Sequence, residues 1–199
     1  MGRKSLANIR KPEIMEHFYE VLIQEGLQGS SIAKIAKHMG VNPSLLTHYF
    51  KSKNEMIVEL IDFIGEKYKE AFIGRIERMR NPKERFDALL DAFFGMEWDK
   101  LIKDSAFYAC FYLGFTNEEV SRRFKRGFSE LRDFVRKEIE MGIKEGIVKE
   151  ETDPAFTADL IIGLQEGISF YSCVAVDNDG RIEAMYQYLK EGARKLLKK

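Results

Sequence analysis

The sequence predicts an all-α fold, and three observations support this prediction. Apolar residues recur three and four positions apart along most of the chain, which is the spacing of one helix face. Proline and glycine stand where these apolar segments begin and end. No segment sustains the alternating, β-branched pattern of a strand. With 199 residues, of which 45% are hydrophobic, the chain can bury a substantial core.

The first three of about nine predicted helices span approximately residues 12–25, 32–39 and 43–50. Pro12 suits the first turn of the first helix, and Gly26 ends that helix. Ser31 is the expected N-cap of the second helix, which Gly40 ends. The third helix begins with a proline, and Asn42 is its expected N-cap.

The remaining predicted helices span approximately residues 53–80, 82–102, 105–113, 117–145, 154–176 and 181–198. Asn81, followed by proline, breaks the long fourth helix. Thr116 or Asn117 caps the seventh helix and Gly146 ends it. Asp153, again followed by proline, starts the eighth. These signals predict helices joined by short turns.

The segment from Ser30 to Lys53 has the spacing of a helix-turn-helix. Ala36 lies where two short helices must cross closely, and Gly40 supplies the turn, where a positive φ is least costly without a Cβ. Leu46 then packs back under the first of the two helices. Such a motif places its second helix in a DNA groove, although other helical hairpins share a glycine turn.

The net charge of zero conceals an asymmetry along the chain. Residues 1–53 carry eight Lys or Arg and four Glu, a net charge of +4, and the other 146 residues carry 24 bases and 28 acids, a net charge of −4. The basic end is also the end with the helix-turn-helix. This distribution suits a protein that presents one end to a polyanion.

The same segment resembles the DNA-binding domain of the TetR/AcrR family of transcriptional repressors. The residues that carry the resemblance are Ile35, Ala36, Gly40, Val41, Leu46, Tyr49, Phe50, Lys53 and Met56. The sequence departs from the family pattern at Thr47, where a tyrosine is usual. The resemblance implies a three-helix DNA-binding domain over residues 1–53 and a larger helical domain for effector binding and dimerisation over residues 54–199.

The third predicted helix exposes polar side chains opposite its apolar side, and their hydroxyl and imidazole groups can bind base edges or phosphates. By the resemblance, the start of this helix lies nearest the bases, while Tyr49, Lys53 and the helix start at Ser31 contact the phosphate backbone. A packed ring and a solvated ammonium are the alternatives for Tyr49 and Lys53. The expected DNA-binding residues are Ser31, Asn42, Pro43, Ser44, Thr47, His48, Tyr49 and Lys53.

Aromatic residues are dense in the fifth, sixth and eighth predicted helices. In the TetR family the middle helices enclose a small-molecule pocket, so the resemblance implies an effector, here mainly apolar or aromatic. A filled core explains any single ring equally well. Three polar positions near the aromatic residues either orient a ligand or face water: Glu97, Gln165 and Glu166. The expected ligand-binding residues are Phe94, Trp98, Phe107, Tyr108, Phe111, Tyr112, Phe170 and Tyr171.

The last two predicted helices have wide apolar coverage, and Gly163 and Gly167 permit close helix approach. In the TetR family these helices form a four-helix dimer interface, whereas packing within one chain is the alternative. The sequence therefore predicts a homodimeric, ligand-responsive regulator, a repressor that binds double-stranded DNA at a palindromic operator. The alternative is a helical small-molecule-binding protein without sequence-specific DNA binding.

Other classes of protein receive little support from the sequence. No nucleophile–base pair or metal cluster is evident, because all three histidines lie within residues 1–53 and Cys110 and Cys173 are far apart. We therefore expect no enzyme, no cofactor and no metal, with His17 and His38 as surface or boundary residues. The sequence shows neither a long apolar run nor a signal peptide, so we expect a cytoplasmic protein without a membrane partner.

Overall fold

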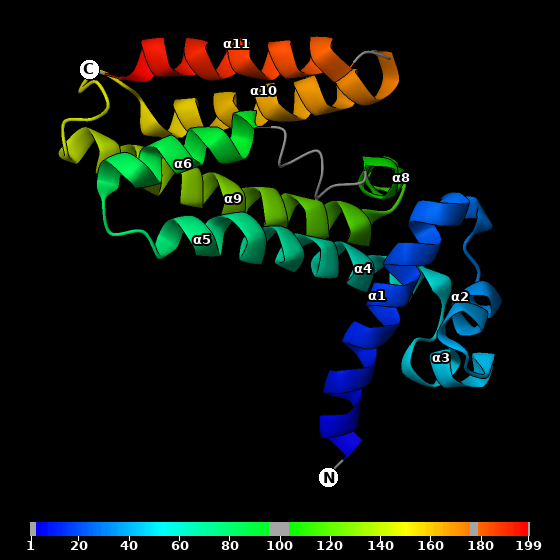
Figure 1. Cartoon of the computed structure of the whole chain (residues 1–199). Coiled ribbons are helices and arrows are strands. Elements are labelled where there is room, and N and C mark those ends of the chain that lie inside the picture. The colour runs from blue at the N-terminus through cyan, green and yellow to red at the C-terminus, as the bar shows by residue number, and fades with distance from the viewer. Residues whose placement is uncertain (1–2, 96–103, 176–178, 199) are drawn as a thin grey trace. The chain divides into compact units, whose positions relative to one another are not determined.

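The computed structural model describes residues 3–95, 104–175 and 179–198 (Figure 1). Within these ranges the chain forms helices and no strand, and the only sheet-like pairing there is a single antiparallel bridge between Val148 and Lys198. The predicted all-α fold is confirmed. None of the described helices has a stretch that is both long enough and apolar enough to cross a membrane.

The helices follow one another along the chain, and Figure 1 labels them. They are α1 (Arg3–Gly29), α2 (Ile32–Met39), α3 (Pro43–Tyr49), α4 (Lys53–Tyr68), the π-helix η1 (Lys69–Ile73), α5 (Gly74–Glu77), α6 (Pro82–Phe94), α8 (Asp104–Leu113), α9 (Glu118–Lys144), α10 (Pro154–Ala175) and α11 (Asp179–Leu197).

The chain divides into two compact units. Unit 1 comprises Met1–Lys67 and Lys103–Gly127, and unit 2 comprises Tyr68–Ile102 and Phe128–Lys199. Unit 1 therefore contains α1, α2, α3, nearly all of α4, α8 and the start of α9. Unit 2 contains η1, α5, α6, the rest of α9, α10 and α11.

The start of α1 differs from the prediction. This helix begins at Arg3 and contains Pro12 in its interior, although an internal proline removes one backbone hydrogen bond and crowds the preceding turn. Side-chain contacts hold this turn in place, because Lys11 forms an ion pair with Glu59 and lies 4.8 Å from the centroid of the Phe50 ring. The end of α1 follows the prediction, since Gly26 has φ 69° and interrupts the helical conformation.

The predicted helix over residues 53–80 is nearly continuous but is not a single α-helix. A five-residue π-helix, η1, interrupts it, and the helical conformation ends at Glu77. The next predicted helix ends early, at Phe94, because Gly95 is extended (φ −112°, ψ 152°). A Cβ at Gly95 would lie 2.3 Å from the carbonyl oxygen of Asp91, so only glycine fits this helix end without a shift.

The core of unit 1 includes the apolar faces of its N-terminal helices. The fully buried side chains there include Ile14, Phe18, Leu22, Ile35, Ala36, Leu46, Phe50, Met56 and Leu60. Ion pairs join α4 to its neighbours in the same unit: Asp62 accepts from Arg123 and, at 2.6 Å, from Arg126, and Lys67 pairs with Glu16 at 2.6 Å. These ion pairs connect the C-terminal half of α4 to α1 and to the start of α9.

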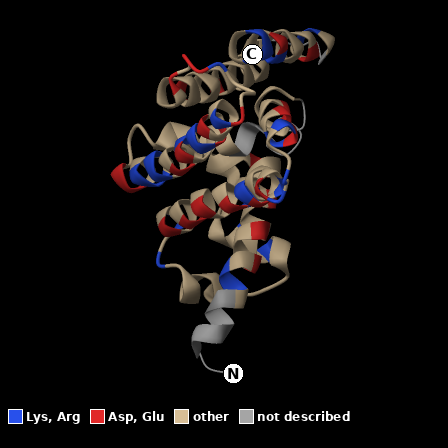
Figure 2. Cartoon of the chain, turned by 90° about the vertical axis from the view of Figure 1, so that its left-hand side faces the viewer, with Lys and Arg blue, Asp and Glu red and all other residues tan. Residues whose placement is uncertain are grey.

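The core of unit 2 lies among α6, α9, α10 and α11. Its buried aromatic side chains include Phe86, Phe93, Phe94 and Tyr186. The Tyr186 hydroxyl lies 2.9 Å from the hydroxyl of Ser169, to which the buried amide of Gln165 donates at 2.9 Å. This polar chain links α10 to α11, and each of its members has a hydrogen-bond partner. Acidic and basic residues are interspersed along the helices (Figure 2).

Candidate nucleic-acid interface and effector region

The predicted helix-turn-helix is present in unit 1, with α2 and α3 joined by a glycine turn. Ser31 caps α2, since its hydroxyl oxygen accepts from the backbone N–H of Lys34 at 3.2 Å. Gly40 has φ 69° and ψ 28°, the left-handed conformation that glycine adopts without strain. Asn42 caps α3 by accepting from the N–H of Ser44 at 3.0 Å. Local chemistry therefore sets both ends of the turn, as predicted.

The two sides of α3 differ as the sequence predicts. Ser44, Thr47 and His48 are exposed, whereas Leu46 and Phe50 are fully buried. The Thr47 hydroxyl donates to the carbonyl oxygen of Ser44 at 3.1 Å, which leaves its lone pairs available as acceptors. The polar side of α3 can therefore reach a base edge or a phosphate without any change in the packing of the helix.

The other predicted DNA-binding residues occupy different environments. Ser31, Asn42 and Pro43 are exposed, and Tyr49 is half-buried with its ring edge against the His48 ring at a centroid distance of 5.1 Å. These residues lie at the start of α2 and along α3. Their exposure is compatible with the contacts expected from the sequence.

Lys53 is half-buried and has a partner within unit 1. Its ammonium donates to the carbonyl oxygen of Leu27, near the end of α1. Burial lowers the pKa of Lys53 because desolvation disfavours the charged form. The side chain therefore fastens the start of α4 to the end of α1. The sequence offers no local signal for this contact, because the two residues are 26 positions apart.

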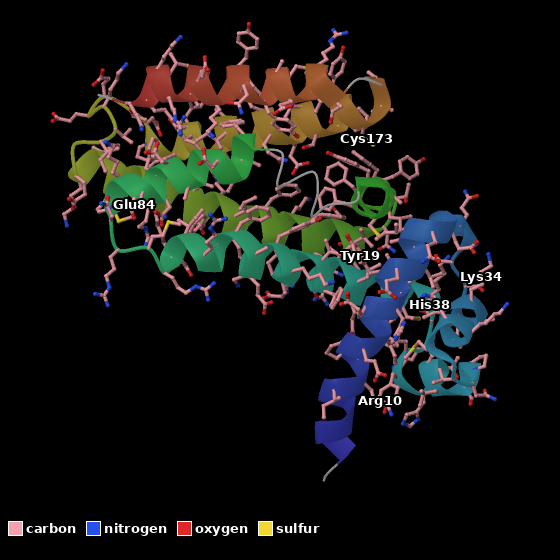
Figure 3. The ribbon with its side chains drawn as sticks, in the orientation of Figure 1. Arg10, Tyr19, Lys34, His38, Glu84 and Cys173 are labelled. Carbon is pink, nitrogen blue, oxygen red and sulfur yellow. The ribbon has the colours of Figure 1, made fainter. Side chains whose placement is uncertain are left out.

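Further basic side chains surround the motif. Lys34 pairs with Glu25 at 2.6 Å, and Figure 3 labels its side chain on α2. Lys37 and Lys51 are exposed. An exposed, partly paired lysine can exchange its partner for a phosphate at little cost, because surface ion pairs are weak. These residues add positive charge near the helix-turn-helix.

The aromatic residues predicted to bind a ligand fall into separate environments. In unit 1, Phe107 and Phe111 of α8 stack at a centroid distance of 6.0 Å, and Tyr108 meets Phe107 edge to face at 5.5 Å. Phe124 of α9 completes this cluster, at 5.7 Å from Phe107 and 5.3 Å from Phe111. The sequence analysis missed Phe124, because only the fold brings this part of α9 next to α8.

 Val120 of α9 is fully buried. The signal that could have found Phe124 is its place four residues after Val120, on the same face of α9.

The remaining predicted ligand-binding residues lie elsewhere. Tyr112 of α8 is 68% exposed, whereas Phe94 of unit 2 is fully buried in the core. Phe170 and Tyr171 of α10 are 57% and 44% exposed. Glu97 and Trp98 lie outside the described residues. The structure thus gathers Phe107, Tyr108 and Phe111 in one cluster, and it places Phe94 in the core of the other unit.

Glu166 of α10 is the polar position with the clearest electrostatic signature. Burial raises the pKa of its carboxyl group to about 7, because desolvation disfavours the charged form. Its neighbour Gln165 is instead held by Ser169. A nearby cation would favour the charged form of Glu166.

The fold and the site define a class: an all-helical protein that presents the second helix of a helix-turn-helix at its surface. Family models agree with this class. Residues 14–60 match the model described as bacterial regulatory proteins, tetR family, and residues 81–199 match the model described as tetracyclin repressor-like, C-terminal domain. The chain belongs to the TetR family of transcriptional regulators.

Individual proteins that resemble this chain share less than a quarter of its residues over the aligned regions. The transcriptional regulator BetI of Escherichia coli is 24% identical over 106 residues, and the chain spans about half the length of this curated relative (53% of each protein). A TetR regulator from Haloarcula marismortui has a similar fold, with a TM-score of 0.84, 21% identity and coverage of 96% of this chain and 100% of that one. A regulator from Saccharomonospora viridis, solved in complex with choline, has a TM-score of 0.81, 15% identity and coverage of 96% and 99%.

Proposed function

We propose that this chain is a homodimeric, ligand-responsive transcriptional repressor that binds a palindromic DNA operator and is released by a small effector. The observation that carries the proposal is the exposed polar side of α3, with Ser44, Thr47 and His48, on a helix anchored by buried Leu46 and Phe50. A short helix that is firmly packed on one side and polar on the other is suited to a major groove. Binding rather than catalysis is the activity proposed.

The proposal assigns DNA binding to residues 1–53 and effector binding with dimerisation to residues 54–199. Asn42, Pro43 and Ser44 are placed nearest the bases because they form the exposed start of α3. Ser31, at the N-terminus of α2, is assigned to phosphate. A cytoplasmic location belongs with this proposal, since a repressor must reach the chromosome.

The roles of the remaining DNA-facing residues follow from their environments. Thr47 and His48 are exposed and are assigned to base edges, and Tyr49 is assigned to the phosphate backbone. For Lys53, the bond to Leu27 favours a positioning role, in which the lysine sets the start of α4 against the end of α1. Direct phosphate contact by Lys53 requires that bond to be exchanged.

An exposed apolar stripe on α10 supports dimerisation through the last two helices. Along one side of this helix lie Phe156 at 67% exposure, Leu160 at 47% and Val174 at 66%. Gly163 and Gly167 lie between them, and a Cβ at either glycine would meet no atom within 4 Å in the single chain. Two copies related by a twofold axis would cover this stripe, and the same symmetry matches a palindromic operator.

The effector proposed from the sequence is mainly apolar or aromatic, and the ring cluster of α8 and α9 supports that class. The choline complex of the Saccharomonospora viridis regulator supports a small organic cation as a second class. To cause release, the effector must bind the conformation that cannot bind DNA more tightly than the conformation that can. These two conformations differ in the distance between the two recognition helices. The repressor dissociates from DNA when the distance between its two recognition helices no longer matches the roughly 34–36 Å between successive major grooves.

A binding assay on DNA flanking the chain's own gene tests the proposal. Fluorescence anisotropy with a salt titration should show tight binding and a steep log–log dependence on salt. Thr47→Ala and His48→Ala should change the preference among operator variants, while Lys137→Ala, an exposed substitution in unit 2, should not. Identical preferences in the wild type and both α3 variants would contradict the assignment.

The alternative of a helical ligand-binding protein without DNA binding is disfavoured. The family model that matches residues 14–60 describes regulatory proteins, and the exposed polar side of α3 is unexplained in a plain carrier. Binding of an effector without salt-dependent DNA binding would favour that alternative.

A further inference from the structure

Two histidines and one glutamate from different helices meet in unit 1. His17 and Glu20 lie one turn apart on α1, and His38 lies in the last turn of α2, where Figure 3 labels it. The Nδ1 atoms of the two histidines are 3.0 Å apart. The Glu20 Oε2 atom lies 3.6 Å from Nδ1 of His17 and 3.7 Å from Nδ1 of His38.

These three atoms have the spacing of ligands around one metal ion. A point equidistant from all three lies about 2.0 Å from each, which is the zinc–nitrogen and zinc–oxygen bond length. In an ideal tetrahedral zinc site, neighbouring donor atoms are separated by about 3.3 Å, between the shortest and longest distances seen here. An ion can therefore be placed against all three atoms with little movement of the helices.

We propose that His17, Glu20 and His38 form a site for a divalent transition metal ion of the zinc class. Two imidazoles and one carboxylate are donors that zinc prefers, whereas calcium and magnesium prefer oxygen donors. The side chains of His17, His38 and Glu20 are 33%, 31% and 47% exposed, so a water molecule can complete the coordination. No part of this proposal depends on DNA binding.

Without a metal ion, the cluster is a hydrogen-bonded pair with a nearby carboxylate. One neutral imidazole donates its Nδ1 proton to the other, and Glu20 accepts when a ring is protonated. A metal ion on both Nδ1 atoms moves each remaining proton to Nε2. Since His17 and His38 belong to different helices, the ion would tie α1 to α2 and stabilise the N-terminal part of unit 1.

Zinc titration of tag-free, metal-stripped full-length protein tests the site by calorimetry. We expect one zinc ion per chain. His17→Ala and His38→Ala should each weaken binding by at least about 100-fold, since each removes a ligand. His48→Ala removes the third histidine, which is not in the cluster, and should leave zinc affinity within about twofold of wild type.

A second measurement distinguishes a formed site from loose surface binding. Cobalt bound by the wild type should give the intense visible absorption of tetrahedral coordination, and both cluster variants should lose it. Circular dichroism of the metal-free variants checks that they fold. Absence of zinc binding by the wild type, or a weak octahedral cobalt spectrum, overturns the proposal. Equal zinc affinity in the wild type and both cluster variants overturns it as well.

Discussion

The buried ion pair between Arg85 and Glu138 gives a quantitative test of how unit 2 is held together. The Glu138 side chain is 5% exposed and that of Arg85 17%. Arg85 donates from Nε to Oε2 of Glu138 at 2.9 Å and from a second nitrogen to Oε1. It also donates to the carbonyl oxygens of Glu77 and Met79 at 3.2 and 3.3 Å. The pair therefore joins α6 to α9, and Arg85 also connects α6 to the C-terminal end of α5 and the residues just after it.

Removing one partner should be costly, whereas removing both should not. Arg85→Met leaves the Glu138 carboxylate buried without its partner, and we expect a loss of about 3–5 kcal/mol in the free energy of unfolding. The double variant with Glu138→Leu removes both charges and should lie within about 1 kcal/mol of wild type. As a control, Arg136→Met breaks an exposed pair with Glu140, whose side chains are 38% and 47% exposed, and should cost less than about 1 kcal/mol.

Urea unfolding followed by circular dichroism measures these differences, with every variant at the same protein concentration because the proposed dimerisation would contribute to stability. The coupling between the two sites comes from the double-mutant cycle. The reasoning is wrong if Arg85→Met costs no more than Arg136→Met, or if the double variant is as unstable as Arg85→Met alone.

Three further predictions concern single positions. Glu166→Gln should stabilise the fold at pH 8 but not at pH 4. The pKa of Glu166 in the folded protein, about 7, lies above its ordinary value of 4.5, so the wild type loses up to about 3 kcal/mol of stability as pH rises through that window. The same pH dependence of the unfolding free energy in wild type and variant would refute this. Gly40→Ala should cost about 1 kcal/mol through backbone strain at φ 69°, since its Cβ would meet no atom within 4 Å, and thermal unfolding checks it. Leu46→Ala should cost about 2–5 kcal/mol and abolish DNA binding, because the side chain is fully buried; unchanged anisotropy would contradict this.

Helix boundaries were predictable from the sequence where short-range chemistry sets them. The bounds of α2 match the prediction, because Ser31 and Gly40 act on residues three or four positions away. The start of α3 matches because Asn42 and the following proline act in the same way. A side chain that caps a helix leaves its signal within one turn of the cap, so a single sequence is enough to find it.

Features that depend on distant residues were not predictable. The start of α1 depends on contacts that Lys11 makes with residues about 40 and 50 positions later. Nothing local marks the π-helix η1. The meeting of His17 with His38 requires the packing of α2 on α1, since 21 positions separate them. The assignment of site residues to DNA or effector stays a prediction.

In α3, the residues that hold the helix in place differ from the residues proposed to contact DNA, and this affects how binding specificity can change. A helix of seven residues is too short to be stable alone, so its place is fixed by its caps and by the burial of Leu46 and Phe50. Ser44, Thr47 and His48 contribute little to that packing because they are exposed. Substitutions at these three positions should therefore alter operator preference while changing stability by less than about 0.5 kcal/mol. A regulator built in this way can acquire a new operator without losing its fold.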